Sequence, residues 1–265
     1  MSKKKVERKA VTIAVTNHKG GVGKTTTTLT VGAILAKRGY KVLFLDLDAQ
    51  SNLTFSMLRE EVDFTSVYDA INTQGAPLPV VQVKENIDIV PSSLDLTQLE
   101  LSMMGMLQRE YLVADKLKPL VDEYDFILID CPPALGIFTV NALSAADFAL
   151  IPMTPEVLPY KGLTSLISLI VNISERINTK LSVLGIFFTK YKANTSLAKN
   201  VEEAVRQVYG PLLLNGKVRD TVKVAEAPID RSSILDYAPK SPAVKDYELI
   251  VDEILQRIKF AETQN

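Results

Sequence analysis

Residues 11–28 place an apolar strand directly before a glycine-rich turn and a helix, an order that constrains the fold more than any other part of the chain. The segment reads Val-Thr-Ile-Ala-Val-Thr-Asn-His-Lys-Gly-Gly-Val-Gly-Lys-Thr-Thr-Thr-Thr. Its first six residues are apolar or β-branched, as in a buried strand. Glycines let backbone N–H groups turn toward a polyanion, and the positive end of the following helix adds to the attraction. The segment therefore predicts a phosphate-binding loop.

The predicted loop supplies candidate ligands for a nucleoside triphosphate. We expect Lys24 to reach the β- and γ-phosphates and the Thr25 hydroxyl to bind Mg²⁺. His18 stands where the general pattern Gly-x-x-x-x-Gly-Lys-Ser/Thr has its first glycine, so the loop is a variant that begins with a second lysine. The candidate cofactor-binding residues of the loop are Lys19, Gly20, Gly21, Val22, Gly23, Lys24, Thr25 and Thr26.

Three carboxylates stand at the ends of two other predicted strands. Asp46 and Asp48 close the apolar segment 41–48, and Asp130 closes the segment 126–130. Ligands of parallel sheets bind outside the carboxyl ends of the strands, so we expect these acids to converge on the loop. Mg²⁺ usually takes only one or two carboxylates and keeps several waters. With Asp130 in the metal shell, an acid remains for an attacking water.

Strands and helices alternate along the chain, which predicts a single doubly wound α/β domain with a mostly parallel central sheet flanked by helices. We expect the domain to span residues 11–265, after a basic tail at residues 1–10. Further strands are expected at 86–90, 126–130, 147–152, 181–188 and, as a short edge strand, 211–215. Helices are expected at 24–38, 94–118, 162–177, 196–209 and 243–260, with Met103, Met104 and Met106 as adaptable core residues.

Composition excludes several classes of protein. Of 265 residues 47% are hydrophobic and 23% charged, as in a globular domain, and the net charge of −1 implies no bulk attraction to nucleic acid or membrane. Cys131 is the single cysteine, so neither a disulfide framework nor a thiolate-ligated cluster can form within one chain, and a reducing cytosol fits. No apolar run reaches transmembrane length.

Several motifs resemble one family of ATPases over nearly the whole chain. The loop at 19–25 resembles the deviant Walker A motif of the group that includes ParA/Soj and MinD. Asp-Leu-Asp-Ala-Gln at 46–50 is similar to the family's Asp-x-Asp-Pro-Gln, with Ala49 in place of proline. Ile-Asp-Cys-Pro-Pro at 129–133 resembles the Asp-x-Pro-Pro Walker B motif of ParA/Soj proteins. The segments 141–147, 151–156, 224–228 and 237–241 resemble later stretches of the same family.

The resemblance implies a ParA-type ATPase for plasmid or chromosome partitioning. It gives catalytic roles to Lys19, Lys24 and Asp48, with Asp48 orienting the water, and it gives a metal-binding role to Thr25, Asp46 and Asp130. Lys19 would reach the phosphates of the other subunit in an ATP-bound homodimer. The implied partners are non-specific DNA and a ParB-like centromere-binding protein that triggers hydrolysis. The implied location is cytoplasmic and nucleoid-associated.

Adenine and DNA contacts are harder to place. Arg219-Asp-Thr221 stands where Soj-like members have Pro-x-Asn facing the adenine, so the resemblance carries the adenine role to Arg219 and Thr221. Thr189 and Lys190 follow a strand where P-loop folds often contact the base.

Residues 180–245 hold 11 Lys and Arg against 6 Asp and Glu, and this local excess of positive charge is a modest indication of phosphate binding. The candidate DNA-binding residues are Lys192, Lys199, Arg206, Lys223 and Lys240.

The main alternative is a MinD-like membrane-associated positioning ATPase. It would need a basic amphipathic C-terminal helix. The segment 243–260 has an apolar stripe, but Asp246, Glu248, Asp252 and Glu253 lie opposite it, so we expect the helix to pack on the sheet and no membrane partner. A metabolic ligase could use the same loop, although no segment marks a small-molecule acceptor. No segment remains for a helix-turn-helix, which argues against sequence-specific operator binding.

Overall fold

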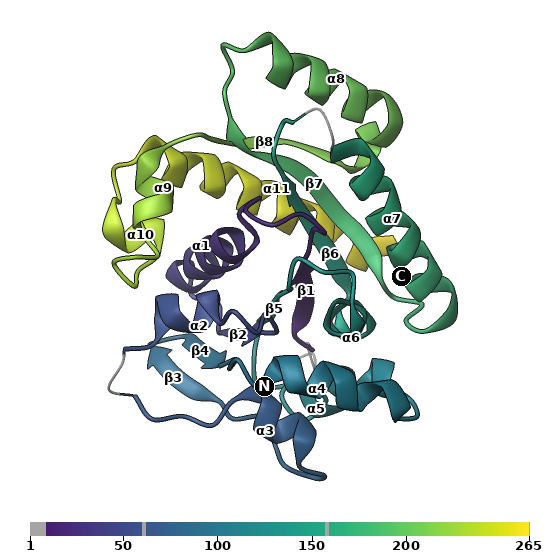
Figure 1. The fold of residues 1–265 in the computed structure, drawn as a ribbon. Coiled ribbons are helices and arrows are strands. Elements are labelled where there is room, and N and C mark those ends of the chain that lie inside the picture. Colours follow the sequence, from purple (N-terminus) through teal and green to yellow (C-terminus); the bar gives the residue numbers. More distant parts are fainter. Residues whose placement is uncertain (1–8, 60–61, 157–158, 265) are drawn as a thin grey trace, which may run out of the picture.

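The computed structural model describes residues 9–59, 62–156 and 159–264, and within them eight strands form one sheet in the order β3-β4-β2-β5-β1-β6-β7-β8 (Figure 1). Every neighbouring pair of strands is parallel except β3 with β4. This confirms the predicted α/β domain. The strands are β1 (Val11–Val15), β2 (Val42–Asp46), β3 (Val81–Lys84), β4 (Ile87–Val90), β5 (Phe126–Asp130), β6 (Phe148–Met153), β7 (Ser182–Tyr191) and β8 (Leu213–Arg219).

The register of the central strands brings the predicted site together. In the pairing of β1 with β5, Val15 lies opposite Asp130, and in the pairing of β2 with β5, Asp130 lies opposite Asp46. The three strands therefore end level with one another. The phosphate-binding loop leaves β1 at the edge where the carboxylates of β2 and β5 stand.

Helices cover both faces of the sheet. In Figure 1, α1 and α11 lie on one face, and α6 and α7 lie on the other. Each side has its own buried apolar cluster. The helices are α1 (Lys24–Lys37), α2 (Asn52–Met57), α3 (Val67–Asn72), α4 (Leu96–Ser102), α5 (Leu112–Leu117), α6 (Ile137–Ala145), α7 (Pro159–Arg176), α8 (Ser196–Tyr209), α9 (Val222–Glu226), α10 (Ile234–Tyr237) and α11 (Pro242–Gln264).

Helix α1 lies unusually close to the sheet at Gly32. A Cβ atom added there would stand 2.1 Å from Cζ of Phe44 and 2.9 Å from Cδ1 of Leu128. Only glycine lets the helix and these strands approach so closely. The helix ends at Lys37, and Gly39, two residues later, has a φ of +91°, as is common after helix C-termini.

Helix α11 packs its apolar stripe on the sheet, as predicted. Tyr247, Ile250, Val251 and Ile254 are each at most 1% exposed and belong to the cluster beneath α1. The acids of the opposite face make local contacts: Asp252 pairs with Arg38 at 2.7 Å, and Glu253 accepts hydrogen bonds from the backbone of β8. The stripe is therefore core of this domain.

The predicted helix 94–118 is wrong. The chain forms α4, two single 3-10 turns at Met103–Gly105 and Arg109–Tyr111, and then α5. Gly105 and a left-handed Gln108 (φ +55°) interrupt the helix. Because the segment does not continue as one helix, most of the apolar residues at helical spacing do not share a buried face. Leu94, Leu101, Met104 and Leu107 are 66–94% exposed. Of the three methionines, only Met103 is buried.

The other differences are smaller. The edge strand predicted at 211–215 is β8, which begins two residues later and runs to Arg219. The sequence reasoning did not predict β3, α6, α9 or α10. Most of the predicted basic tail, residues 1–8, lies outside the described residues.

Candidate functional site

The loop between β1 and α1 adopts a conformation that depends on glycine. Gly21 and Gly23 have φ values of +73° and +87°, a region that other residues rarely adopt. The loop is also held by β7, which lies two strands away from β1 in the sheet, because the hydroxyl of Thr189 donates to the carbonyl oxygen of Val22 at 2.7 Å. The backbone amides are therefore fixed around a concave site before any ligand arrives.

Lys24 is the first residue of α1, and it is only 7% exposed. Its Nζ donates to the carbonyl oxygen of Lys19 across the loop at 3.1 Å. Burial lowers the pKa of Lys24, and the nearby carboxylates of Asp130 and Asp48 oppose this shift. An ammonium group that is largely removed from water at the mouth of a glycine loop is suited to bind an anion.

Thr25 lies against the carboxylate of Asp130, as a shared magnesium site requires. Its Oγ1 donates to Oδ2 of Asp130 at 2.7 Å, and Thr28 donates to the other oxygen at 3.2 Å. Burial, and then the charge of Asp46, raises the pKa of Asp130. A divalent cation would favour the charged carboxylate again, and hydroxyl and carboxylate oxygens are the donors that Mg²⁺ prefers.

Asp46 lies behind this position and is satisfied by the protein itself. It is fully buried, and its oxygens accept hydrogen bonds from Asp48 N at 3.1 Å, Thr54 N at 2.9 Å and Thr54 Oγ1 at 2.8 Å. Burial raises the pKa of Asp46, and the bonds from Thr54 oppose that shift. Among the residues that the structure describes, no three His, Cys, Asp or Glu side chains form a metal-binding group. The geometry gives Asp46 contacts with the segment 48–54, and its metal-binding role stays a prediction.

The two carboxylate oxygens of Asp48 differ in the hydrogen bonds that they accept. Its Oδ1 accepts a hydrogen bond from Gln50 N at 3.0 Å. No donor among the described residues reaches Oδ2. The residue is 9% exposed and lines the cavity next to the loop. A carboxylate oxygen in that position can accept a proton from a water or hold the water in place.

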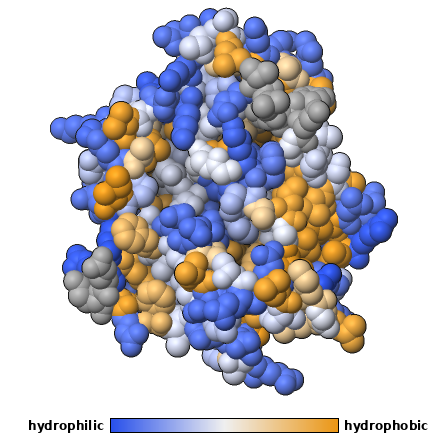
Figure 2. Space-filling model, viewed as in Figure 1, coloured by the Kyte–Doolittle hydropathy of each residue, from blue (hydrophilic) through white to orange (hydrophobic). Residues whose placement is uncertain are grey.

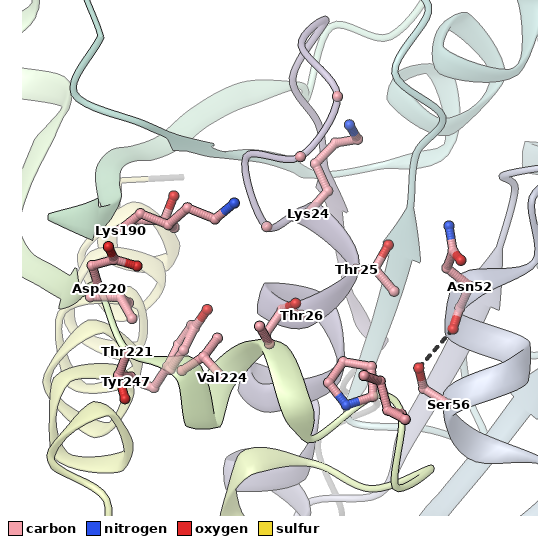
Figure 3. Close-up of a pocket in the computed structure, with 18 of the residues that line it drawn as sticks. Lys24, Thr25, Thr26, Asn52, Ser56, Lys190, Asp220, Thr221, Val224 and Tyr247 are labelled. Carbon is pink, nitrogen blue, oxygen red and sulfur yellow. Dashed lines mark hydrogen bonds between the residues drawn. The ribbon is translucent and has the colours of Figure 1, made fainter.

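The site opens into a cavity of about 590 Å³, which is ample for a nucleotide. Figure 3 shows Lys24, Thr25 and Thr26 on one side, Asn52 and Ser56 of α2 on another, and Thr221 and Val224 below. The predicted residues that line the cavity are Gly20, Gly21, Gly23, Lys24, Thr25, Thr26, Asp48, Arg219 and Thr221. Lys19 and Val22 of the loop, and Asp46 and Asp130 beneath it, do not line it.

The cavity wall includes Thr189 and Lys190, which the sequence marked as possible base contacts and which lie within β7 rather than after a strand. Lys190 has a left-handed backbone (φ +50°), and its side chain extends toward the loop that carries Lys24 (Figure 3). Sequence reasoning missed other residues of the wall. Tyr247 also lines the cavity and lies 3.4 Å from the hydroxyl of Thr27, but in the sequence it belongs to the apolar stripe of α11. No sequence signal separates it from that stripe.

The two candidate adenine residues differ in what they can offer. The Arg219 guanidinium donates to both oxygens of Asp246 on α11, at 2.7 and 2.8 Å, and the backbone N–H of Arg219 donates to Asp246 as well. Its side chain is therefore engaged at the cavity wall. Thr221 is the residue before α9 and has no such partner for its side chain among the described residues. The adenine role of both residues stays a prediction.

Lys19 lies at the start of the loop and does not line the cavity. Its ammonium group forms an ion pair with Glu156, which follows β6, and its side chain is 39% exposed. The hydrogen bond from Lys19 lowers the pKa of Glu156. The backbone N–H of Lys19 donates to Oδ1 of Asn17 at 3.0 Å. The ammonium groups of Lys19 and Lys24 therefore have different partners, Glu156 for Lys19 and the carbonyl oxygen of Lys19 for Lys24.

All five candidate DNA-binding residues are exposed, and three of them pair with acids. Lys192 lies 3.2 Å from Asp220, and Lys223 lies 2.9 Å from Glu226. Arg206 lies 3.1 Å from Glu202 on the same helix. Lys199 and Lys240 have no ion pair among the described residues. Exposed pairs of this kind are weak and can exchange for phosphate, so the DNA role stays a prediction.

No helix of the described residues is both long enough and apolar enough to cross a membrane.

Comparisons with known proteins identify relatives along almost the whole chain. Residues 10–183 match the family described as AAA domain. The chain is 36% identical to the chromosome-partitioning ATPase Soj of Treponema pallidum, over 93% of this chain and 97% of that protein. It is 34% identical to the sporulation initiation inhibitor protein Soj of Bacillus subtilis, over 91% and 97%. Among solved structures, cobyrinic acid a,c-diamide synthase of Mycobacterium smegmatis, with bound ADP and magnesium, superposes with a TM-score of 0.81 at 30% identity, over 94% of this chain and 96% of that one.

Proposed function

The chain belongs to the Soj/ParA family of partitioning ATPases, and from that premise we propose that it works as an ATP-dependent homodimer that binds DNA without sequence preference. Its hydrolysis is stimulated by a ParB-like partner, and it acts in the cytoplasm on the nucleoid. The observation that carries this proposal is the orientation of the two loop lysines. Lys24 is buried and lines the cavity, whereas Lys19 of the same loop is partly exposed, does not line the cavity and pairs with Glu156.

ATP and Mg²⁺ are the ligands that suit the cavity. The loop amides and Lys24 bind the phosphates, and the space between α2, α9 and the ends of β7 and β8 accommodates the nucleoside. Thr25 and Asp130 hold the metal ion, which neutralises charge on the β- and γ-phosphates when bound. The related synthase from M. smegmatis, which binds ADP and magnesium, supports the same choice of ligand.

Asp48 is the group that orients the attacking water. It lines the cavity, and its Oδ2 is left without a donor from the described residues. Asp46 keeps the backbone of Asp48 in place through the bond to Asp48 N. In this proposal Asp130 is the carboxylate at the metal ion and Asp48 is the carboxylate at the water.

Lys19 acts across the dimer. A single site needs only one lysine under its phosphates, and Lys24 fills that role. Lys19 does not line its own cavity, and a second subunit facing the loop would present its nucleotide to it. Its charge would offset that of the partner's phosphates, as an arginine finger does when supplied in trans. Figure 2 shows an apolar area beside the position of α6, and the partly buried Ile137 and Val140 belong to that helix, so apolar surface is present on the same molecule for a partner.

The proposal of DNA binding rests on residues 180–245, where Lys and Arg outnumber Asp and Glu, whereas the net charge of the whole chain is −1. Dimerisation would double the number of basic side chains that one DNA segment meets, and so would couple DNA binding to ATP. The buried stripe of α11 supports this reading over the MinD-like alternative, because its apolar residues are committed to the core.

A co-sedimentation experiment tests the proposal. Asp48→Ala protein with ATP is mixed with duplexes of two unrelated sequences or with anionic liposomes. We expect equal binding to both duplexes, no binding to liposomes, and loss of DNA binding when ADP replaces ATP. Equal DNA affinity in ATP and ADP contradicts the nucleotide-gated dimer, and preferential sedimentation with liposomes supports the MinD-like alternative. Turnover of ATP only in the presence of a small-molecule acceptor would instead indicate a ligase.

A further inference from the structure

Four buried residues near the site form a closed ring of hydrogen bonds. Asp46 Oδ1 accepts from Asp48 N at 3.1 Å, and Asp46 Oδ2 accepts from Thr54 Oγ1 at 2.8 Å. Thr54 Oγ1 accepts from Ser92 N at 2.9 Å, and Ser92 Oγ donates to the carbonyl oxygen of Asp48 at 2.8 Å, which closes the ring. The ring joins the end of β2, helix α2 and the segment that follows β4.

The hydroxyl of Thr54 both donates and accepts a hydrogen bond within the ring. The Thr54 hydroxyl donates its one proton to Asp46 and accepts one bond from Ser92. Thr54 is 4% exposed and Ser92 is 2% exposed, so water cannot replace either bond without a rearrangement. Loss of the Thr54 hydroxyl would leave the buried N–H of Ser92 without a partner, which is costly in a site closed to water. Loss of the Ser92 hydroxyl would remove one of the two hydrogen bonds that the carbonyl oxygen of Asp48 accepts.

The ring holds both of the peptide groups that flank Asp48. Asp46 holds the N–H of Asp48, and Ser92 holds its carbonyl oxygen. The same carbonyl accepts a bond from Ser51 N at 2.8 Å, and Ser51 has a left-handed backbone with φ +52°. A non-glycine residue in that region costs energy and persists only where its surroundings determine it. The ring is the surrounding structure that maintains this turn.

We propose that Thr54 and Ser92 are positioning residues that set the carboxylate of Asp48 for hydrolysis, a role that rests on the function proposed for Asp48 above. Neither side chain lines the cavity, so neither touches nucleotide. Both act through the backbone of Asp48 and through Asp46. A displacement of about 1 Å in a group that orients a reactant can cost a hundredfold in rate.

The experiment compares ATP turnover of Thr54→Val, Thr54→Ser and Ser92→Ala. Valine keeps the shape of threonine and removes the hydroxyl, and serine restores the hydroxyl. We expect Thr54→Val and Ser92→Ala to lower kcat by about ten- to a hundredfold while KM for ATP changes by less than about threefold. Thr54→Ser should recover most of the rate. The matched controls are Thr139→Val and Ser144→Ala on α6, two buried hydroxyls that donate to backbone carbonyls outside the ring and should leave kcat unchanged.

A second arm repeats Thr54→Val and Ser92→Ala on the Asp48→Ala background. If Thr54 and Ser92 act through Asp48, their substitution should not lower the residual ATP turnover of Asp48→Ala any further. A loss of kcat as large as in the native background overturns the proposal. If Thr54→Val and Ser92→Ala keep the wild-type kcat while Asp48→Ala is inactive, the positioning role of Thr54 and Ser92 is overturned and the role of Asp48 is not. Wild-type turnover in Asp48→Ala contradicts the function proposed for Asp48 and is distinguishable from failure of the ring. Failure of Thr54→Ser to restore the rate also overturns the proposal.

Discussion

Lys19 of the phosphate-binding loop forms an ion pair with Glu156, although 137 positions separate the two residues in the sequence. Glu156 follows β6, and β6 pairs directly with the loop strand β1, so the pair bridges neighbouring strands. The lysine that we propose to act on a second subunit is thus held by an acid of its own chain. On that proposal, dimerisation has to break this pair.

The pair predicts that Glu156→Gln strengthens the ATP-dependent dimer. The substitution removes the charge and keeps the shape of the side chain, which releases Lys19. An exposed pair of this kind is weak, so we expect the dimer dissociation constant to fall by up to about fivefold per released lysine. Light scattering with ATP on the Asp48→Ala background measures it. Glu203→Gln on α8 is the control, and an unchanged constant in Glu156→Gln argues against a restraining role.

Lys19→Ala gives the complementary prediction. On the Asp48→Ala background, this variant should bind ATP with normal affinity, since Lys24 remains in place, but should stay monomeric because no charge reaches the partner's phosphates. Calorimetry measures ATP binding, and light scattering measures mass. A dimer as strong as that of Asp48→Ala alone would show that Lys19 has no role across the interface.

Lys24→Ala should weaken ATP binding by about a hundredfold, because the buried ammonium is the main charge of the loop on the phosphates. Lys37→Ala, an exposed lysine in the last turn of the same helix, should not change the affinity. Titration calorimetry compares the two variants. Equal affinities for both would contradict the assignment of the loop.

Lys223→Ala should reduce the salt dependence of DNA binding. Counterion release gives a log–log slope of about −0.9 per neutralised duplex phosphate, so the loss of one contact makes the slope shallower by about 1. ATP affinity should not change. Lys118→Ala is the matched control, because Lys118, directly after α5, also pairs with an acid three positions away. DNA binding that is unaffected in Lys223→Ala would move the contact to another basic residue.

Gly32→Ala should destabilise the fold without any direct effect on the site. The new Cβ would meet the Phe44 ring at 2.1 Å, and overpacking of this kind costs about 1–3 kcal/mol. Thermal unfolding should show a lower Tm, partly restored by Phe44→Leu in the double variant. Gly105→Ala, where no atom lies within 4 Å of the added Cβ, is the control. An unchanged Tm in Gly32→Ala would show that α1 can shift away from the sheet.

The fold and the centre of the site could be predicted because their signals are local. An apolar run followed by glycines and a lysine identifies β1, the loop and α1, and strands that end in aspartate identify β2 and β5. The segment 94–118 could not be predicted, because apolar residues at helical spacing there face solvent on two short helices and two turns. Spacing alone does not show whether a residue has a partner to pack against.

Other parts of the site depend on contacts between distant segments. The Arg219–Asp246 pair and the Lys19–Glu156 pair join residues whose meeting is set by the order of the strands. The same holds for Ser92, which a sequence would leave as one more serine after a strand. Motifs show which residues can do chemistry, but the side chains that restrain or position them become visible only in the folded chain.

The position of β1 in the middle of the sheet has a consequence for synthesis. β1 pairs with β5 and β6, whose residues emerge from the ribosome more than a hundred positions later. Such a high contact order slows folding. The nucleotide cavity is completed only when Tyr247 of α11 arrives. A nascent chain therefore lacks both partners of its loop strand until β6 has been made, and the wall of its cavity stays incomplete until α11 has been made.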